Sequence, residues 1–250
     1  MLHYPSPMII ELTIFHTNDI HNKLPEDFNF PVTPDLLLDG GDAIGGSNTV
    51  FRFSEPILRK MKALGYHGMA LGNREFHYIR SIMYRRREEA SFPFLSANLL
   101  DLTGRTEKII SPFLIKEIKD LKVAILGLTV QILPPGSFWE KIFNFKFLDP
   151  LATAEKYVPE LRKQADLLII LSHLGKDMDI ILAGRVPGID LIIGGHSHTP
   201  LDKPLEINKT LIVQAGCLAK SFGTIKLNMQ QSDKGYFLES FNFKIITINE

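Results

Sequence analysis

Five short apolar runs in this chain each end in a turn that carries aspartate, asparagine or histidine. The runs cover residues 8–16, 35–39, 68–71, 167–171 and 191–193. The polar residues that end or follow them are Asp19, His21, Asp42, Asn73, His173, His196 and His198. Runs that are apolar throughout are typical of strands covered on both faces, and ligands of open α/β sheets bind at the carboxyl ends of such strands. The pattern predicts an α/β fold that brings these seven side chains to one place.

Helices are predicted between several of the runs, at residues 55–64, 79–90, 151–163 and 178–184. In the first of them apolar residues recur three and four positions apart, with Ser54 as the expected N-cap and Gly65 at the end. Residues 24–34 contain too many prolines for a crossover helix and are predicted to form a loop. Further strands are predicted at residues 94–97 and 122–128, and the strand-rich sequence after Leu211 is expected to complete a sheet.

The charge balance gives no support for nucleic acid or an anionic membrane as a partner. The 28 basic and 28 acidic residues cancel, so such binding would need a local patch. No run approaches the roughly 20 apolar residues of a membrane helix, and the start of the chain lacks the basic segment of a secretory signal. The single Cys217 cannot form an internal disulfide. We therefore expect a cytoplasmic protein with no membrane and no nucleic acid as partners.

The seven polar residues form a chemically coherent set of metal ligands. Imidazoles, carboxylates and an amide oxygen suit borderline divalent ions such as Zn, Mn, Fe, Ni or Co. A carboxylate such as Asp42 can bridge two ions about 3.5–4 Å apart, the separation used by two-metal phosphatases. Glycine pairs adjoin several of these residues and permit the sharp turns that a ligand at a strand end requires.

Each motif taken alone has an ordinary alternative. An isolated Asp-Ile-His at residues 19–21 arises by chance, and Asn73 could cap a helix instead of binding an ion. The pair His196 and His198 is more specific, because two histidines at positions i and i+2 after an apolar strand cannot both pack on one core face. The ordered set of five motifs is far more specific than any of its members.

That ordered set resembles the calcineurin-like metallophosphoesterases, and more closely the catalytic N-terminal domain of the 5′-nucleotidase family. The matching stretches are HTNDIH at 16–21, DGGD at 39–42, ALGNREFH at 70–77, SHLG at 172–175 and GGHSHT at 194–199. Weaker matches at residues 95–98, 188–190 and 213–216 carry the similarity across most of the chain.

The resemblance implies a fold, a site and a reaction. The implied fold is a four-layer α-β-β-α sandwich of two mixed sheets. By position, Asp19, His21 and His198 would hold one divalent ion, Asn73, His173 and His196 the other, and Asp42 would bridge the two. Hydroxide between the ions would attack phosphorus in line, and the expected activity is hydrolysis of phosphate monoesters such as nucleotides. The alternatives are a phosphodiesterase acting on small or cyclic nucleotides and a metal-binding scaffold whose catalysis has weakened.

The chain departs from the family at two catalytic positions. The family usually has a histidine after the asparagine and an aspartate three residues later, but Arg74 and His77 stand there. A guanidinium cannot donate a proton near neutral pH, although it can stabilise charge on phosphate. If a helix begins at this point, the two side chains face the same volume. We therefore consider Asn73, Arg74 and His77 as catalytic residues, with His77 as the acid, against the alternative that leaving-group assistance is lost.

Three further expectations concern the rest of the molecule. We expect residues 1–250 to form a single catalytic domain without the C-terminal domain that stacks on the nucleobase in full-length relatives, so Phe138 and Trp139 are considered as stacking residues. The short connection from Asp19 to Asp42 leaves sheet surface for a loop or a second chain to cover, which makes a homodimer possible. Arg85, Arg86 and Arg87 favour a solvated helix face over a phosphate site, because Glu88 and Glu89 flank them.

Overall fold

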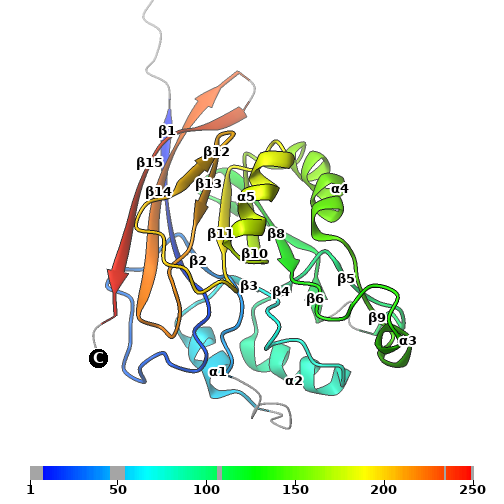
Figure 1. Cartoon of the computed structure of the whole chain (residues 1–250). Coiled ribbons are helices and arrows are strands. Elements are labelled where there is room, and N and C mark those ends of the chain that lie inside the picture. The colour runs from blue at the N-terminus through cyan, green and yellow to red at the C-terminus, as the bar shows by residue number, and fades with distance from the viewer. Residues whose placement is uncertain (1–7, 46–53, 106–108, 234, 249–250) are drawn as a thin grey trace, which may run out of the picture.

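A computed structural model of the chain describes residues 8–45, 54–105, 109–233 and 235–248 (Figure 1). Within these ranges the longest sheet has seven strands, two of them antiparallel to their neighbours at one end and the rest parallel. Its strands in spatial order are β15 (Gly235–Thr247), β14 (Ser221–Ser232), β1 (Ile9–Thr17), β2 (Leu36–Asp39), β3 (Gly68–Ala70), β4 (Phe94–Leu95) and β6 (Ile110–Ser111).

The second sheet is also mixed, with six strands among the described residues. Its four central strands are parallel, and an antiparallel strand lies at each edge. In spatial order they are β12 (Leu205–Ile207), β13 (Thr210–Val213), β11 (Leu191–Gly194), β10 (Leu167–His173), β8 (Leu121–Thr129) and β7 (Phe113–Ile118). A separate antiparallel pair joins β5 (Leu99–Asp101) to β9 (Phe145–Phe147).

Three hydrophobic clusters show how the layers stack. The first packs α1 (Pro56–Ala63) and α2 (Arg80–Ala90) against one face of the first sheet, and the second fills the space between the two sheets. The third packs α4 (Pro150–Arg162) and α5 (Lys176–Arg185) against the outer face of the second sheet. The order of layers is therefore helices, sheet, sheet, helices, and the predicted four-layer α-β-β-α sandwich of two mixed sheets is confirmed.

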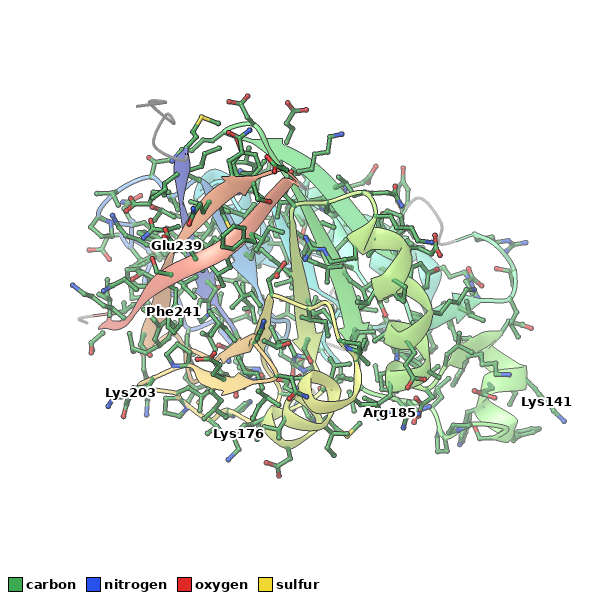
Figure 2. The ribbon with its side chains drawn as sticks, turned by 90° about the horizontal axis from the view of Figure 1, so that it is seen from above. Lys141, Lys176, Arg185, Lys203, Glu239 and Phe241 are labelled. Carbon is green, nitrogen blue, oxygen red and sulfur yellow. The ribbon has the colours of Figure 1, made fainter. Side chains whose placement is uncertain are left out.

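Figure 2 shows from above the edge of the first sheet and one helix of the outer layer. The edge strand β15, with Glu239 and Phe241, crosses one side of the molecule, and α5, which runs from Lys176 to Arg185, lies on another. Within the part of the chain that the structure describes, no helix is both long and apolar enough to cross a bilayer.

One local prediction about a helix start is wrong, and one alternative that the sequence left open is excluded. Glu55, not Ser54, occupies the N-cap of α1, and its side chain makes no cap bond because it turns inward toward the buried guanidinium of Arg86, 3.7 Å away. The helix α2 begins only at Arg80, so Asn73 caps no helix and residues 73–75 form a turn.

The aromatic segment at residues 134–148 divides between core and surface. Phe145 and Phe147, in β9, are fully buried, as the sequence density of aromatics favours. A short helix that the sequence did not predict, α3 (Phe138–Phe143), leaves Phe138 and Trp139 more than half exposed. One short segment thus contributes some of its aromatic residues to the core and others to the surface.

The loop between β1 and β2 covers part of one face of the first sheet. Phe28 and Phe30 from this loop pack against the first cluster, and their rings contact Phe222 with centroids 6.1 and 5.0 Å away. Phe30 also contacts Phe15 on β1 at 5.6 Å. The loop therefore supplies the cover that the sequence argument left open between a loop and a second chain, and a homodimer stays a prediction.

Candidate metal centre

The candidate ligands gather where the carboxyl ends of parallel strands from both sheets meet. Asp19 follows β1, Asp42 follows β2 and Asn73 follows β3, whereas His173 is the last residue of β10 and His196 follows β11. A hydrogen bond joins the sheets at this point, because Nδ1 of His173 lies 2.8 Å from the carbonyl oxygen of Gly40. The sequence prediction that several strands deliver polar groups to one place is met by this geometry.

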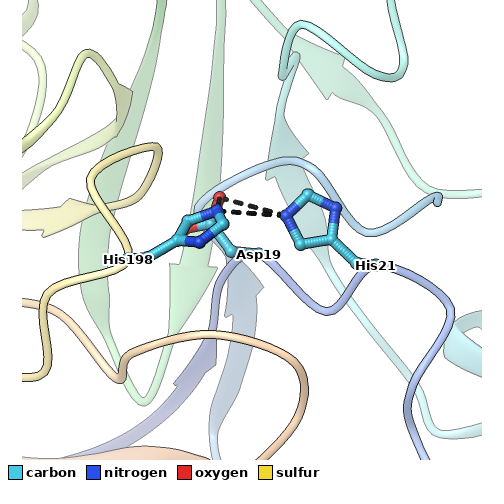
Figure 3. A group of neighbouring side chains, drawn as sticks. All are labelled: Asp19, His21 and His198. Atoms are coloured by element: carbon cyan, nitrogen blue, oxygen red, sulfur yellow. Dashed lines mark hydrogen bonds and ion pairs between the residues drawn. The ribbon is translucent and has the colours of Figure 1, made fainter. Parts of the chain in front are cut away.

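Asp19, His21 and His198 form the first group of the site (Figure 3). Oδ1 of Asp19 lies 3.2 Å from Nε2 of His198 and 3.9 Å from Nε2 of His21. The two Nε2 atoms are 3.1 Å apart. Nδ1 of His21 lies 3.3 Å from the carbonyl oxygen of Ile44, which favours the tautomer whose Nε2 lone pair points into the group.

Asp42 and His173 form a second group that shares Asp19 with the first. Nε2 of His173 lies 3.4 Å from Oδ1 of Asp42 and 3.2 Å from the amide oxygen of Asn73. Since Nδ1 of His173 faces a carbonyl oxygen, its Nε2 points toward these two oxygens and can bind an ion once it is deprotonated. His196 lies beside His173, with ring centroids 5.1 Å apart, but it belongs to neither of the two groups.

The electrostatics of these groups fit divalent cations. Within the described ranges, Oδ1 of Asp19 is buried and has no hydrogen-bond donor, while its other oxygen accepts from Asn18 and from the backbone of His196. Burial alone would lower the pKa of His173, but the Asp42 carboxylate outweighs it and raises that pKa to about 9. Two carboxylates and converging imidazoles with an orphaned buried oxygen are a donor set suited to Zn²⁺, Mn²⁺ or a similar ion.

The backbone at the site adopts an unusual conformation. Most of the candidate ligands have a positive φ, which non-glycine residues rarely adopt but which aspartate, asparagine and histidine tolerate best. The residues and angles are Asp19 at 51°, His21 at 49°, Asp42 at 56°, His196 at 73° and His198 at 56°. Each chain segment thus turns sharply just beyond its strand, and the turns direct these side chains inward.

Glycine is required where the two sheets come closest. A Cβ on Gly40 would lie 2.7 Å from the carbonyl oxygen of Gly194, and one on Gly195 would lie 2.5 Å from the carbonyl oxygen of Gly40. Both distances are too short for any side chain. The paired glycines predicted to flank the ligands therefore let the turn after β2 touch the turn after β11.

Several polar residues that support the ligands were not predicted from the sequence. Glu75 is fully buried, and its carboxylate accepts hydrogen bonds from the backbone N–H groups of Asp42, Ile44 and Gly72 at 2.8, 3.1 and 3.0 Å. Burial, followed by the nearby Asp42 charge, raises the pKa of Glu75 to about 7. The only sequence signal was its place within the matched ALGNREFH stretch.

Arg74 lies beside the site, but Arg74 and His77 do not share a helix. Nε of Arg74 is 3.8 Å from Oδ2 of Asp42, and the Arg74 side chain is 40% exposed, so part of it is open to a ligand. His77 is buried, and its Nδ1 accepts a hydrogen bond of 2.9 Å from the backbone of Ile79. The premise that a helical turn aligns the two side chains is wrong, because α2 starts later, at Arg80.

The arginine run on α2 also differs from its prediction. Arg86 is fully buried and donates hydrogen bonds to the carbonyl oxygens of Arg74 and Glu75 at 3.3 and 3.2 Å. The prediction of a solvated face is therefore wrong for this arginine. Its interior position follows from the buried carboxylate of Glu55, which offers it an opposite charge.

The two candidate stacking residues, Phe138 and Trp139, stand at the far end of a series of ring contacts. The series runs from His77 to Tyr78, Phe143 and Trp139, with successive centroid distances of 4.6, 4.7 and 5.6 Å. Phe138 contacts Trp139 at 6.1 Å. Three ring contacts thus separate Trp139 from His77, and the faces of Tyr78 and Phe143 are used by their neighbours.

The chain is similar in sequence to a known protein family and to individual proteins. A sequence model of the calcineurin-like phosphoesterases matches residues 12–200. The 5′-nucleotidase of Vibrio cholerae is 32% identical, aligned over 76% of this chain and 41% of that protein. The trifunctional nucleotide phosphoesterase YfkN of Bacillus subtilis is 27% identical, aligned over 98% of this chain and 20% of that protein.

A solved structure agrees with the fold described above. The crystal structure of a 5′-nucleotidase precursor from Thermus thermophilus has a TM-score of 0.77 and 27% identity, covering 96% of this chain and 55% of that one. The chain spans about two fifths of the Vibrio cholerae relative and about a fifth of the Bacillus subtilis one.

Proposed function

The chain belongs to the calcineurin-like phosphoesterase family, and from that premise we propose that it hydrolyses phosphate esters at a centre of two divalent ions. The observation that carries the proposal is the convergence of Asp19, His21 and His198 at one point and of Asp42 and His173 beside it. Asn73 and His196 adjoin the second group and complete the proposed ligand set. Mn, Zn, Fe, Ni and Co all suit these donors.

Divalent ions held there would supply Lewis-acid chemistry to a phosphoryl group. The protein contributes the arrangement of the ligands. Asp42 belongs to the second group and is the proposed shared ligand. His21 and His173 each direct Nε2 inward because their Nδ1 atoms face backbone carbonyl oxygens. The two imidazoles are thereby oriented before an ion arrives.

Arg74 is the proposed contact to the phosphate. Its Nε is buried without a hydrogen-bond acceptor in the described part of the chain, yet it belongs to a partly exposed side chain beside Asp42. A guanidinium in this position can neutralise charge that develops on phosphoryl oxygens. His77 is the proposed proton donor to the leaving group. Because its Nδ1 accepts a hydrogen bond, Nε2 carries the proton of the neutral ring.

Phosphate monoesters, and nucleotides first among them, are the proposed substrates. The relative from Vibrio cholerae is named a 5′-nucleotidase and the solved protein from Thermus thermophilus a 5′-nucleotidase precursor. Residues 12–200, which the family model matches, include every proposed ligand. We propose that this chain supplies the catalytic domain of such an enzyme. The cytoplasmic location expected from the sequence stays a prediction.

The proposal is tested with metal analysis and a substrate panel. The chelator-treated protein is loaded separately with Mn²⁺, Zn²⁺, Ni²⁺, Co²⁺ and Mg²⁺, bound ions are counted, and phosphate release is measured from nucleoside monophosphates, a nitrophenyl monoester and a nitrophenyl diester. We expect two ions per chain and preferential release from monoesters. Faster cleavage of the diester would reassign the protein as a phosphodiesterase, and two bound ions without hydrolysis of any ester would make it a scaffold.

A further inference from the structure

Two loops that carry proposed ligands are joined through the buried side chain of Glu75. Asp42 belongs to the loop after β2 and Asn73 to the loop after β3, and each strand pairs directly with the other. The Glu75 carboxylate lies between these loops with none of its surface exposed. Its Oε2 accepts from the N–H groups of Asp42 and Gly72, and its Oε1 accepts from Ile44.

These hydrogen bonds hold the backbone at or close to two proposed ligands. In the first loop, Glu75 holds Asp42 itself and Ile44, two residues further on. In the second loop it holds Gly72, which directly precedes Asn73. Asp42 in turn accepts a hydrogen bond of 2.8 Å from the backbone of Arg74. A shift of Glu75 would therefore change the spacing between the loops.

The other side of the same turn is held by a buried cation. Arg86 donates to the carbonyl oxygens of Arg74 and Glu75, the two residues that follow Asn73. Its guanidinium presents several donors in a fixed plane and is fully buried on α2. The turn at residues 72–75 is thus fixed at the N–H of Gly72 by Glu75 and at the carbonyl groups of Arg74 and Glu75 by Arg86.

We propose that Glu75 and Arg86 are positioning residues that set the separation of Asp42 and Asn73, and hence the affinity for the ion these two ligands share. The inference rests on the proposed function, because it concerns the same centre. Neither side chain needs to touch an ion or a substrate. Groups that support metal ligands typically change metal affinity about 10- to 100-fold when they are replaced.

The competing explanation is that both residues only stabilise the fold. Both residues make buried hydrogen bonds through a charged group, so replacing either residue lowers stability in both explanations. Metal affinity separates them. A residue that acts only on the fold lowers the melting temperature and leaves the ion affinity of the folded protein unchanged.

The test compares Mn²⁺ binding by calorimetry in the chelator-treated wild type, Glu75→Gln and Arg86→Lys, all below their melting temperatures. Glutamine keeps the size of Glu75 but replaces one acceptor oxygen by an NH₂ group, and lysine keeps the charge of Arg86 but loses its planar set of donors. The matched control is Thr210→Val. It removes the buried 2.8 Å hydrogen bond from Thr210 to the carbonyl of Ile189, at the end of β13 remote from the site.

We expect Glu75→Gln to weaken one of two Mn²⁺ sites by about 10- to 100-fold and Arg86→Lys by about 10-fold, while Thr210→Val binds Mn²⁺ like the wild type. Wild-type affinities in folded variants that melt at lower temperature would overturn the proposal. If Glu75→Gln does not fold, unchanged affinity in Arg86→Lys overturns it alone. A wild type that binds no divalent ion would refute the proposed function and this inference together, whereas two ions bound equally by all proteins would refute only this inference.

Discussion

Nε2 of His21 and Nε2 of His198 lie 3.1 Å apart although 177 positions of sequence separate the two residues. Two ligands at about 2.05 Å from one tetrahedral Zn²⁺ would have nitrogen atoms about 3.3 Å apart. The observed spacing is therefore close to that of two imidazoles sharing an ion, with Oδ1 of Asp19 as the third ligand at 3.2 Å from His198. This relationship leads to the first prediction.

Replacing His198 by alanine should remove one ion and leave the fold intact. The His198 side chain is 44% exposed, so little packing is lost. We expect bound Mn²⁺ to fall from two ions per chain to one, and hydrolysis to fall by more than the roughly 10- to 100-fold typical of residues that only support ligands. Metal analysis and rates on a nitrophenyl phosphate measure both effects. Lys203→Ala is the control, because Lys203 is exposed in the same connection between β11 and β12, and equal effects of the two substitutions would contradict the assignment.

Arg74→Ala should slow hydrolysis of good and poor leaving groups alike. Its proposed contact is with the phosphoryl oxygens, whose charge does not depend on the alcohol released, and loss of one such donor costs about 100-fold or more in kcat. Parallel kcat measurements on a nitrophenyl phosphate and a nucleoside monophosphate check this. A loss confined to the nucleotide would show that Arg74 contacts the nucleoside instead.

His77→Ala should have the opposite selectivity. A proton donor matters when the leaving group is a poor one, so we expect a drop of about 100-fold on the nucleotide and little change on the nitrophenyl ester. His77→Gln, which keeps a donor but cannot transfer a proton, should behave as the alanine variant does. Equal loss on both substrates would remove the acid assignment.

His16 should make the protein less stable in mild acid. The ring is fully buried on β1, and neither ring nitrogen has a hydrogen-bond partner within the described ranges, so burial lowers its pKa to about 3. The unfolded chain binds a proton on this histidine below about pH 6.5, and the folded chain does not. Titration of His16 therefore leaves the free energy of unfolding unchanged above that pH, and lowers it by about 1.4 kcal/mol per pH unit between pH 6.5 and 3.

The measurement compares urea unfolding of the wild type and His16→Leu at pH 7.5, 6.0 and 5.0. A chelator is present throughout, because the proposed ligand histidines also titrate in this range. We expect the difference between the two free energies of unfolding to shift in favour of the leucine variant by about 1–2 kcal/mol at the lowest pH. Parallel curves would mean that His16 is hydrated or paired in solution.

Phe30→Ala should destabilise the fold, because the loop side chain covers the first sheet. Phe30 is only partly buried, so we expect a loss of about 2–3 kcal/mol, below the range of fully buried phenylalanines. Asn29→Ala, at an exposed neighbouring position, should change the free energy of unfolding by less than about 0.5 kcal/mol. Similar effects at both positions would show that the loop does not hold the sheet.

The sequence predicted the strands well, because they depend on local signals. An apolar run that ends in a turn with polar residues marks the end of a parallel strand, and this holds for β1, β2, β3, β10 and β11. The limits of the four predicted helices agree with α1, α2, α4 and α5 to within two residues. The N-cap of α1 was missed, because Ser54 was chosen from residue preference whereas the inward turn of Glu55 depends on contact with the distant Arg86.

What the sequence could not show is the support of the site. Glu75 accepts hydrogen bonds from three N–H groups, two of them in a loop more than 30 residues away. Backbone donors do not depend on residue type, so the sequence does not reveal them. The buried position of Arg86 was hidden by the charged residues on either side of it. The short strands β5, β6 and β9 have only two or three residues each, too few for a periodic pattern that predicts them.

The positive φ angles at Asp19, His21, Asp42, His196 and His198 limit how the centre can be redesigned. Each position must carry a side chain that binds a cation and must also tolerate a left-handed backbone. Aspartate, asparagine and histidine meet both conditions, whereas glutamate and cysteine gain nothing from that backbone and β-branched residues are strained by it. Substitutions meant to change the preferred metal are therefore limited, at these five positions, to exchanges among aspartate, asparagine and histidine.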